Sequence, residues 1–347
     1  MIIYWLIKRF RRWREERRAQ QAPQPTKPTR PPTAAPRPPS AAPLDAAAAI
    51  SVRGLRKAYG DHDAVRGIDF DVQRGEIVAF LGPNGAGKTT TVEILEGYRS
   101  PTAGEVQVLG ADPDTAGRSW RESIGVVLQD SEPEPYLTAR QCLELYAGYY
   151  SRPRPIDETL ALVGLEAKAD AIAGTLSGGQ RRRLDVALAL VGDPELVFLD
   201  EPTTGFDPSA RRNAWQVVAD LRALGKTIFL TTHYMDEAEF LADRIIVLAG
   251  GAIVAEGTPG TLGGRDRSAA RITFTLPADL DAADIPSEFV ASARRNGRVE
   301  ARTTTPVEDL RSLTVWAAER GLELPDLEVR RATLEDIYLE LTGATST

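Results

Sequence analysis

A glycine-rich segment that ends in a lysine is the clearest place for chemistry in this sequence. It comprises Gly82, Pro83, Asn84, Gly85, Ala86, Gly87, Lys88, Thr89 and Thr90 and matches the pattern GxxxxGK[ST]. Glycines let the backbone curl so that its N–H groups face a phosphate. The lysine then reaches the β- and γ-phosphates of a nucleotide, and the Thr89 hydroxyl binds Mg²⁺. The segment therefore predicts a nucleotide-binding phosphate loop.

A pair of adjacent carboxylates, Asp200 and Glu201, is the second candidate. Because neighbouring residues at the end of a strand point to opposite faces, the two groups suit different tasks. Asp200 suits holding Mg²⁺ through water, and Glu201 suits orienting or deprotonating the water that attacks the γ-phosphate. The alternative is a solvated acidic turn before Pro202, which is common in isolation but disfavoured downstream of a phosphate loop.

The elements that must position these groups are short apolar strands. Residues 77–81 precede the phosphate loop, residues 196–199 precede Asp200, and residues 227–232 precede His233. After the phosphate loop, apolar residues recur at helical spacing. This succession of strand, glycine-rich turn and helix predicts an α/β fold with a P-loop core.

A second glycine-containing motif lies between the phosphate loop and the carboxylate pair. Its residues are Leu176, Ser177, Gly178, Gly179 and Gln180, and they resemble the signature of ATP-binding-cassette (ABC) ATPases. A flexible Ser-Gly loop is the alternative. In the ABC family this signature does not serve the nucleotide of its own subunit but acts in trans, on one bound elsewhere. The resemblance therefore implies a partner as well as a nucleotide site.

Three single residues extend the resemblance. Gln129, after the apolar run 124–128, matches the glutamine that in ABC ATPases senses Mg²⁺ and the attacking water and couples to the membrane partner. His233 matches the switch histidine that contacts the γ-phosphate. Tyr59 matches the aromatic residue that stacks on adenine, with a half-buried strand tyrosine as the alternative. A glutamine after a strand is usually only a loop residue, so the position of Gln129 between phosphate loop and signature carries the assignment.

The segment 202–208 resembles the stretch that crosses the dimer interface beside the catalytic glutamate of ABC ATPases. The family usually has a leucine where this chain has Phe206, a change that keeps an apolar contact. Asp207 is the residue of this segment to which the resemblance gives a role in the interface and in catalysis.

The order of these motifs from Tyr59 to His233 identifies the chain as a member of the ABC transporter ATP-binding subunits over about residues 50–260. The resemblance implies an ATPase that uses ATP and Mg²⁺. The metal would be held by Thr89, Gln129 and Asp200, and catalysis would involve Glu201, His233, Gln129 and Asp207. It also implies two copies paired head to tail, with Ser177 and Gly179 of one closing over the ATP of the other. A separate transmembrane permease would hold both copies at the cytoplasmic face of the membrane.

Composition divides the chain into four expected parts. Residues 1–19 form a basic amphipathic segment, and residues 20–49, with nine prolines, form a disordered linker. Residues 50–263 form the ATPase domain, in which about 131–190 correspond to the helical subdomain of the family. Residues 264–347 form a small C-terminal α/β appendage, with strands expected at 271–276 and 327–331 and helices at 307–320 and 334–341.

The last helix of the appendage is similar to one in exporter ATPases. Residues 334–343 resemble the C-terminal tail of bacterial multidrug and antibiotic-resistance subunits, including the daunorubicin-resistance type. The resemblance implies export of drugs, lipids or other small amphiphiles, with dimerisation or regulation as the task of the tail. An importer ATPase and a non-transport ABC ATPase that regulates a cytoplasmic complex remain alternatives. The signature and His233 disfavour an ordinary P-loop kinase or GTPase.

The first residues combine an apolar run with a basic run. Residues 1–7 are apolar and are followed by Lys8, Arg9, Arg11, Arg12, Arg14, Arg17 and Arg18. A helix here would place its apolar residues on one face and its arginines opposite, which suits contact with an anionic membrane surface. The alternatives are a disordered extension, or upstream sequence included by a wrongly chosen start codon.

The overall composition fits one sizeable core plus a smaller piece, since 42% of the 347 residues are apolar. Residues 1–49 carry a net charge of +7 (10 basic, 3 acidic) and the remainder −14 (32 basic, 46 acidic), so the body offers no nucleic-acid footprint. The longest apolar run, residues 1–7, is shorter than the roughly 20 residues that span a bilayer. A single cysteine, Cys142, excludes an intramolecular disulfide and fits a reducing compartment.

Overall fold

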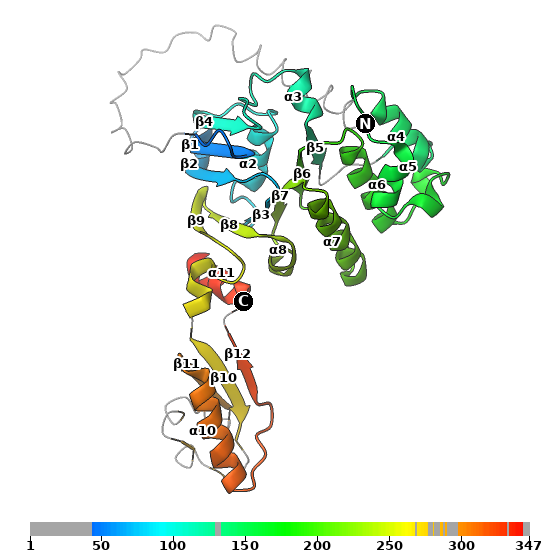
Figure 1. Cartoon of the computed structure of the whole chain (residues 1–347). Helices are drawn as coiled ribbons and strands as arrows, with labels where there is room; N and C mark the ends of the chain where they lie inside the picture. The colour runs from blue at the N-terminus through cyan, green and yellow to red at the C-terminus, as the bar shows by residue number, and fades with distance from the viewer. Residues whose placement is uncertain are drawn as a thin grey trace, which may run out of the picture. The chain divides into compact units, whose positions relative to one another are not determined.

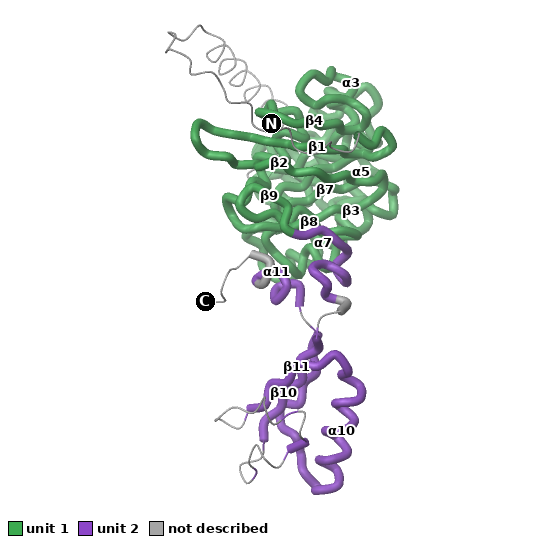
Figure 2. Tube along the Cα trace, turned by 90° about the vertical axis from the view of Figure 1, so that its left-hand side faces the viewer, with its two compact units in different colours: residues 1–254 green, residues 255–347 purple. Residues whose placement is uncertain are grey.

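The computed structural model describes residues 44–128, 133–267, 269–276, 298–331 and 333–342, together with Leu280, Ile285, Pro286 and Phe289. The basic segment 1–19, most of the linker and Gln129 lie outside the described residues. The chain divides into two compact units between Val254 and Ala255 (Figure 2). This division precedes the boundary expected at 263, because the short helix η3 (Leu262–Arg267) contacts α11 (Leu334–Thr342) of the second unit.

A six-stranded sheet forms the centre of the first unit, with hydrogen-bonded order β5-β6-β7-β3-β8-β9 (Figure 1). Its strands are β3 (Ile77–Leu81), β5 (Ile124–Val127), β6 (Leu196–Asp200), β7 (Thr227–Thr232), β8 (Arg244–Ala249) and β9 (Ala252–Gly257). The pairs β3–β7, β3–β8, β5–β6 and β6–β7 are parallel. Strands β3, β6 and β7 are buried along their whole length, which is why they read as continuous apolar runs. The predicted α/β core is confirmed.

A second, antiparallel sheet packs on the first. It contains β1 (Ile50–Tyr59), β2 (His62–Val72) and β4 (Ala103–Val108) in the order β2-β1-β4. Phe70 of β2 lies against two aromatic rings of the parallel sheet, with centroids 5.8 Å from Phe80 and 6.0 Å from Phe229. The end of the expected disordered linker is part of this structure, because Ala48 and Ala49 are buried and Ala49 N donates to Val72 O at 2.7 Å.

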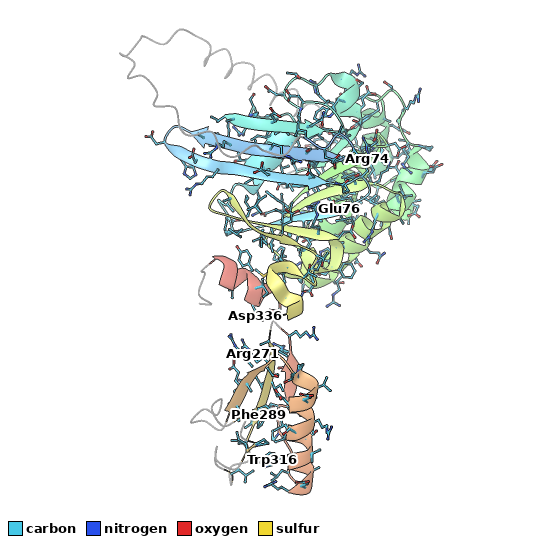
Figure 3. All side chains as sticks on the ribbon, turned by 60° about the vertical axis from the view of Figure 1, so that its left-hand side comes forward. Arg74, Glu76, Arg271, Phe289, Trp316 and Asp336 are labelled. Carbon is cyan, nitrogen blue, oxygen red and sulfur yellow. The ribbon has the colours of Figure 1, made fainter. Side chains whose placement is uncertain are left out.

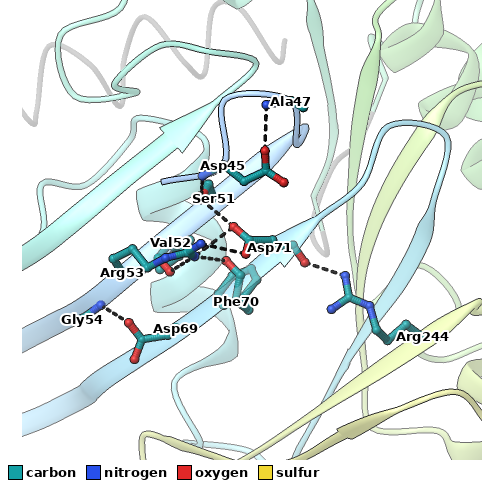
Figure 4. Close-up of polar contacts among 10 residues, drawn as sticks. All are labelled: Asp45, Ala47, Ser51, Val52, Arg53, Gly54, Asp69, Phe70, Asp71 and Arg244. Carbon is teal, nitrogen blue, oxygen red and sulfur yellow. Dashed lines mark hydrogen bonds and ion pairs between the residues drawn. The ribbon is translucent and has the colours of Figure 1, made fainter. Parts of the chain in front are cut away.

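A polar network ties the two sheets together (Figure 4). The Asp71 carboxylate accepts hydrogen bonds from Ser51 Oγ at 2.5 Å and from Arg53 Nη2 at 2.8 Å, while Arg244 of β8 donates to Asp71 O at 2.5 Å. Arg244 also forms an ion pair with Glu76 at 2.7 Å. Burial alone would raise the pKa of Asp71, but these hydrogen bonds and the nearby arginine charges outweigh it and lower the pKa. The ionised carboxylate of Asp71 thus joins β2 to β1, while its backbone carbonyl joins β2 to Arg244 of the parallel sheet.

Helices between β5 and β6 form a cluster of their own (Figure 1). They are α4 (Ala139–Ala147), α5 (Ile156–Leu162), the turns η1 (Glu166–Lys168) and η2 (Ala173–Thr175), and α6 (Gly178–Leu190). Helices α4, α5 and α6 contact one another, around buried Cys142, Leu143 and Tyr146. Two other large apolar residues of this cluster, Leu145 and Tyr149, are exposed. The other helices described in this unit are α2 (Lys88–Leu95), α3 (Arg118–Glu122), α7 (Pro208–Ala223) and α8 (Met235–Leu241).

The second unit contains a three-stranded antiparallel sheet and a long helix. Its elements are β10 (Ala270–Thr275), β11 (Arg298–Thr303), α10 (Pro306–Glu319), β12 (Glu328–Arg330) and α11, and the strand order is β11-β10-β12. Phe274, Phe289 and Trp316 belong to its core, the last two labelled in Figure 3. The predicted strands and helices of this unit are confirmed to within one or two residues. Strand β11 was not predicted, because its buried residues Val299, Ala301 and Thr303 form only a weak apolar pattern.

No helix among the described residues is both long enough and apolar enough to cross a membrane.

Candidate functional site

The phosphate loop, residues 82–90, joins β3 to α2, as the sequence predicted. Two of its glycines are required by their surroundings. A Cβ atom at Gly82 would lie 2.4 Å from Leu248 O, and one at Gly87 would lie 2.5 Å from Ala64 O. Gly87, with φ of 104°, is also the N-cap of α2, in a conformation that side chains disfavour. The loop can therefore curl tightly around the start of α2, where backbone N–H groups bind anions.

Lys88 lies at the centre of this loop. Its side chain is 4% exposed, and its Nζ donates to Gly82 O at 2.8 Å and to Pro83 O at 3.3 Å. The same Nζ lies 3.4 Å from Glu201 Oε1. The structure thus brings the lysine of the phosphate loop together with the second carboxylate of the predicted pair.

The two carboxylates at the end of β6 have different surroundings. Asp200 is buried and accepts a hydrogen bond from Thr231 Oγ1 at 2.5 Å. Its burial, and to a lesser degree the charge of Glu201, raise the pKa of Asp200 in spite of that hydrogen bond. The Glu201 carboxylate instead lies among polar groups, since Oε2 accepts from Thr204 Oγ1 at 3.2 Å. The two carboxylates therefore lie in different environments, which fits the different tasks expected from the sequence.

His233 follows β7 and reaches the other side of Glu201. Its Nδ1 lies 3.4 Å from Glu201 Oε2, a distance that allows an ion pair when the imidazole is protonated. This contact is not a hydrogen bond, and Nδ1 is buried without a hydrogen-bond partner in the described part of the chain. Lys88, Glu201 and His233 therefore form one continuous cluster contributed by α2, the end of β6 and the end of β7.

The signature residues lie at the start of α6. Ser177 is the N-cap, and a capping box joins it to Gln180, with Gln180 N donating to Ser177 Oγ at 3.3 Å and Ser177 N donating to Gln180 Oε1 at 3.0 Å. The serine oxygen accepts in this box, so its own O–H can still donate. Residues 177–180 line a hollow of about 540 Å³ together with Asp207 and residues of α7. Among the described residues that line it, none belongs to the phosphate loop.

Asp207 and Tyr59 have local partners. The Asp207 carboxylate caps α7 by accepting from Ser209 N and Ala210 N, both at 2.9 Å. Tyr59 ends β1 and is 41% exposed. Two cations flank its ring, with Lys57 Nζ 5.3 Å and Arg99 Cζ 5.4 Å from the centroid. An exposed ring held by cations can stack on a planar base.

Two residues near the site, Arg182 and Glu237, were not predicted from the sequence. Arg182 belongs to a run of three arginines, residues 181–183, but it is buried and donates to backbone carbonyls outside its own helix. Glu237 of α8 is fully buried and accepts from Thr203 Oγ1 at 2.8 Å and from Trp215 Nε1 at 3.0 Å. Neither has a motif, because the hydrogen-bond acceptors of Arg182 are backbone carbonyls and the donors to Glu237 are distant in the sequence. Arg182 also lies 3.9 Å from Asp185 of its own helix.

Magnesium fits the oxygen groups at this site. The described residues hold no group of three or more histidine, cysteine, aspartate or glutamate side chains able to cage a metal ion. Mg²⁺ needs no such cage, because it keeps several waters and binds one or two protein oxygens beside substrate phosphates. The carboxylate of Asp200 at the end of β6 and the exposed Thr89 hydroxyl at the start of α2 are groups of this kind.

Known proteins that are similar to this chain share both of its units. Residues 65–204 match the family model of ABC transporters, and residues 270–333 match that of the C-terminal domain of ABC transporter domain-containing protein-like proteins. The chain is 40% identical over 312 residues to Nod factor export ATP-binding protein I of Ralstonia nicotianae, covering 85% of this chain and 94% of that protein. The chain belongs to the ATP-binding subunits of ABC transporters. The identity and the ATPase class expected from the motifs are confirmed.

Other ABC ATP-binding proteins show the same likeness. Daunorubicin resistance ATP-binding protein DrrA3 of Streptomyces coeruleorubidus is 38% identical over 309 residues, covering 86% of this chain and 97% of the relative. Among solved structures, cbiO1 of Clostridium perfringens is 30% identical, with a TM-score of 0.56 over 61% of this chain and 89% of that one. A dimeric ATP-binding cassette in a post-hydrolysis state with ADP and Pi is 28% identical, with a TM-score of 0.54 over 60% of this chain and 98% of that one.

Proposed function

We propose that two copies of this ABC ATPase subunit pair head to tail, hydrolyse ATP with Mg²⁺ at their interface, and drive export through a separate transmembrane permease. The cluster of Lys88, Glu201 and His233 carries the proposal, because it joins a phosphate-binding lysine to a carboxylate and an imidazole. The signature residues line a different hollow, shared with α7, which supports action on the nucleotide of a second copy. The relative solved as a dimer with ADP and Pi supports the same arrangement.

Each group has a distinct task in this scheme. Backbone N–H groups of residues 82–90 and Lys88 hold the β- and γ-phosphates. Glu201 orients the attacking water and accepts its proton, while His233 contacts the γ-phosphate and stays within 3.4 Å of the Glu201 carboxylate. Ser177 of the second copy donates its hydroxyl hydrogen to the γ-phosphate, and Gly179 donates its backbone N–H. The exposed ring of Tyr59 stacks on adenine.

Mg²⁺ would be held by Thr89, Asp200 and, from the sequence, Gln129, and when bound it neutralises charge on the β- and γ-oxygens. Thr231 holds the Asp200 carboxylate in place through its hydrogen bond at 2.5 Å. Asp207 anchors the interface segment by capping α7.

The printed names of two relatives, Nod factor export and daunorubicin resistance, support export of a drug, lipid or other small amphiphile. In this proposal the subunit works at the cytoplasmic face of the membrane, bound to its permease, and residues 1–19 add contact with the membrane surface.

The Glu201→Gln variant tests the trans arrangement. Removing the proton acceptor should lower kcat by at least about 100-fold while leaving ATP binding intact. With ATP and Mg²⁺ the variant should therefore accumulate as a dimer, measured by light scattering after size exclusion. The control is Glu201→Gln combined with Lys88→Ala, which should stay monomeric because the phosphates are no longer held. A Glu201→Gln protein that binds ATP and remains monomeric would contradict the proposal.

A further inference from the structure

Arg182 connects the signature helix to the chain on both sides of Glu201. It lies in α6, one turn beyond Ser177, and its side chain is 9% exposed. Its Nε donates to Pro202 O at 2.9 Å, and its Nη2 lies 3.5 Å from Asp200 O. Its Nη1 donates at 2.6 Å to Leu128 O, the carbonyl directly before Gln129. The side chain of Arg182 thus connects α6 to the end of β6 and to Leu128, the residue that precedes Gln129.

The backbone that Arg182 holds is strained. Glu201 has φ of 47°, the left-handed region that residues with a Cβ disfavour. Such conformations persist only where the surroundings fix them. Before Glu201, Thr231 holds Asp200, and Glu201 N donates to Thr231 Oγ1 at 3.0 Å. After Glu201, the fixed points are Pro202 O, held by Arg182, and the Thr203 hydroxyl, held by Glu237 at 2.8 Å.

We propose that Arg182 is a positioning residue that couples the signature helix to the catalytic carboxylate of the same subunit. The inference rests on the proposed function, in which Ser177 and Gly179 of each subunit contact the ATP of the other. A shift of α6 when the signature closes over that ATP moves the carbonyls on both sides of Glu201. Each subunit therefore aligns its own Glu201 only when its signature has engaged the nucleotide of the other copy, and the two sites become interdependent.

A purely structural role for Arg182 predicts different behaviour. A packing residue would change stability, ATP affinity and turnover together. A positioning residue leaves ATP affinity unchanged, because its hydrogen bonds to Leu128 O, Asp200 O and Pro202 O lie outside the phosphate loop, and it changes kcat and cooperativity. Misplacing a catalytic group by about 1 Å costs on the order of 100-fold in rate.

The experiment compares Arg182→Gln, Arg182→Lys and Arg183→Gln in the full chain. Arg183 is a matched control, because it also donates to backbone carbonyls, at 3.0 Å to Gly164 O, but these lie beyond α5 and far in sequence from Glu201. For Arg182→Gln we expect kcat to fall about 10- to 100-fold, the Kd for a fluorescent ATP analogue to stay within about twofold, and the Hill coefficient for ATP to fall towards one. Arg182→Lys keeps a donor and should recover part of kcat. Arg183→Gln should stay within about twofold of the parent kcat.

Two kinetic outcomes overturn the inference, and a third comes from the dimerisation assay below. One is an Arg182→Gln protein with unchanged kcat and Hill coefficient. The other is a parallel loss of ATP affinity, thermal midpoint and kcat that Arg182→Lys does not relieve.

A dimerisation assay separates the inference from the proposed function. If Glu201→Gln alone fails to dimerise with ATP and Mg²⁺, the proposed function fails. If it dimerises and Glu201→Gln with Arg182→Gln does not, Arg182 acts on association and only the inference fails.

Discussion

Glu237 is a buried carboxyl group held by neutral donors. It accepts hydrogen bonds from Thr203 and Trp215, and Oε2 has no hydrogen-bond partner within the described part of the chain. Burial raises the pKa of Glu237, and the neighbouring polar groups of Thr232, Thr203 and Trp215 and the charge of Arg211 oppose that shift only in part. Arg211 itself pairs with Asp236 at 3.3 Å. The folded chain therefore favours the protonated, neutral form of Glu237 more than the unfolded chain does.

This shift predicts a pH-dependent contribution to stability. A group whose pKa is raised by folding stabilises the fold fully below its unfolded pKa, ordinarily 4.5, and loses that contribution as the pH rises through the folded value. Glu237→Gln keeps the acceptor oxygen without the titration. From pH 5 upwards, the thermal midpoint of the parent should therefore fall relative to that of Glu237→Gln. A difference between the two midpoints that is constant with pH would contradict this prediction.

The residues that the sequence revealed share one property. In the proposed function, Lys88, Asp200 and Glu201 act through side chains whose type is dictated by phosphate, metal or water, so their pattern repeats wherever the chemistry does. Arg182 and Glu237 act by holding other residues. Arg182 binds carbonyl oxygens, which every residue carries, and Glu237 binds a threonine and a tryptophan that only folding brings near it. Sequence patterns alone cannot reveal partners of this kind.

Among the elements, strands buried on both faces were the easiest to predict. β3, β6 and β7 are short, apolar throughout and followed by residues with recognisable chemistry. β11 was missed because half of its residues face solvent and the buried half is small, as in Ala301. The ends of elements were predicted well where a cap was visible, such as Pro306 at the start of α10.

The helix α4 contains Cys142, the only cysteine of the sequence. Its position in the helix predicts how fast the thiol reacts with an alkylating reagent. Cys142 is buried, and burial raises its pKa to about 11. At pH 8 its thiolate fraction is about 100-fold below that of a thiol with the ordinary value of 9.0. Iodoacetamide should therefore label the folded protein slowly, and labelling should become rapid in urea, as followed by intact mass. Rapid labelling of the folded chain would show that α4 opens readily. Cys142→Ser should remove the signal in both conditions.

At the scale of the whole molecule, residues 1–43 should be separable from ATP hydrolysis. The described structure begins just before Asp45, whose backbone N donates to Ser51 Oγ at 3.0 Å, so a chain lacking residues 1–43 keeps the contacts of β1. Its basal ATPase rate should stay within about twofold of the full chain, since Lys88 and Glu201 are untouched.

The same deletion tests membrane contact. The full chain should sediment with phosphatidylglycerol vesicles, and the deleted chain should not. The control is the full chain with Arg11, Arg12 and Arg14 changed to glutamine, which should bind more weakly. Equal binding by all three proteins would assign membrane contact to another surface, and loss of ATPase activity on deletion would show that the segment is not separable.

The left-handed backbone of Glu201 also bears on how this protein responds to selection. Glycine and asparagine adopt that conformation with less strain than glutamate does, a difference of about 1–2 kcal/mol for glycine. Lys88 would keep its carbonyl partners Gly82 and Pro83 after such a change. Such a substitution relieves backbone strain at the position that the proposed function makes catalytic, while it also removes the carboxylate beside the buried Lys88. A gain in thermal resistance from a change at Glu201 is therefore a poor guide to ATP turnover.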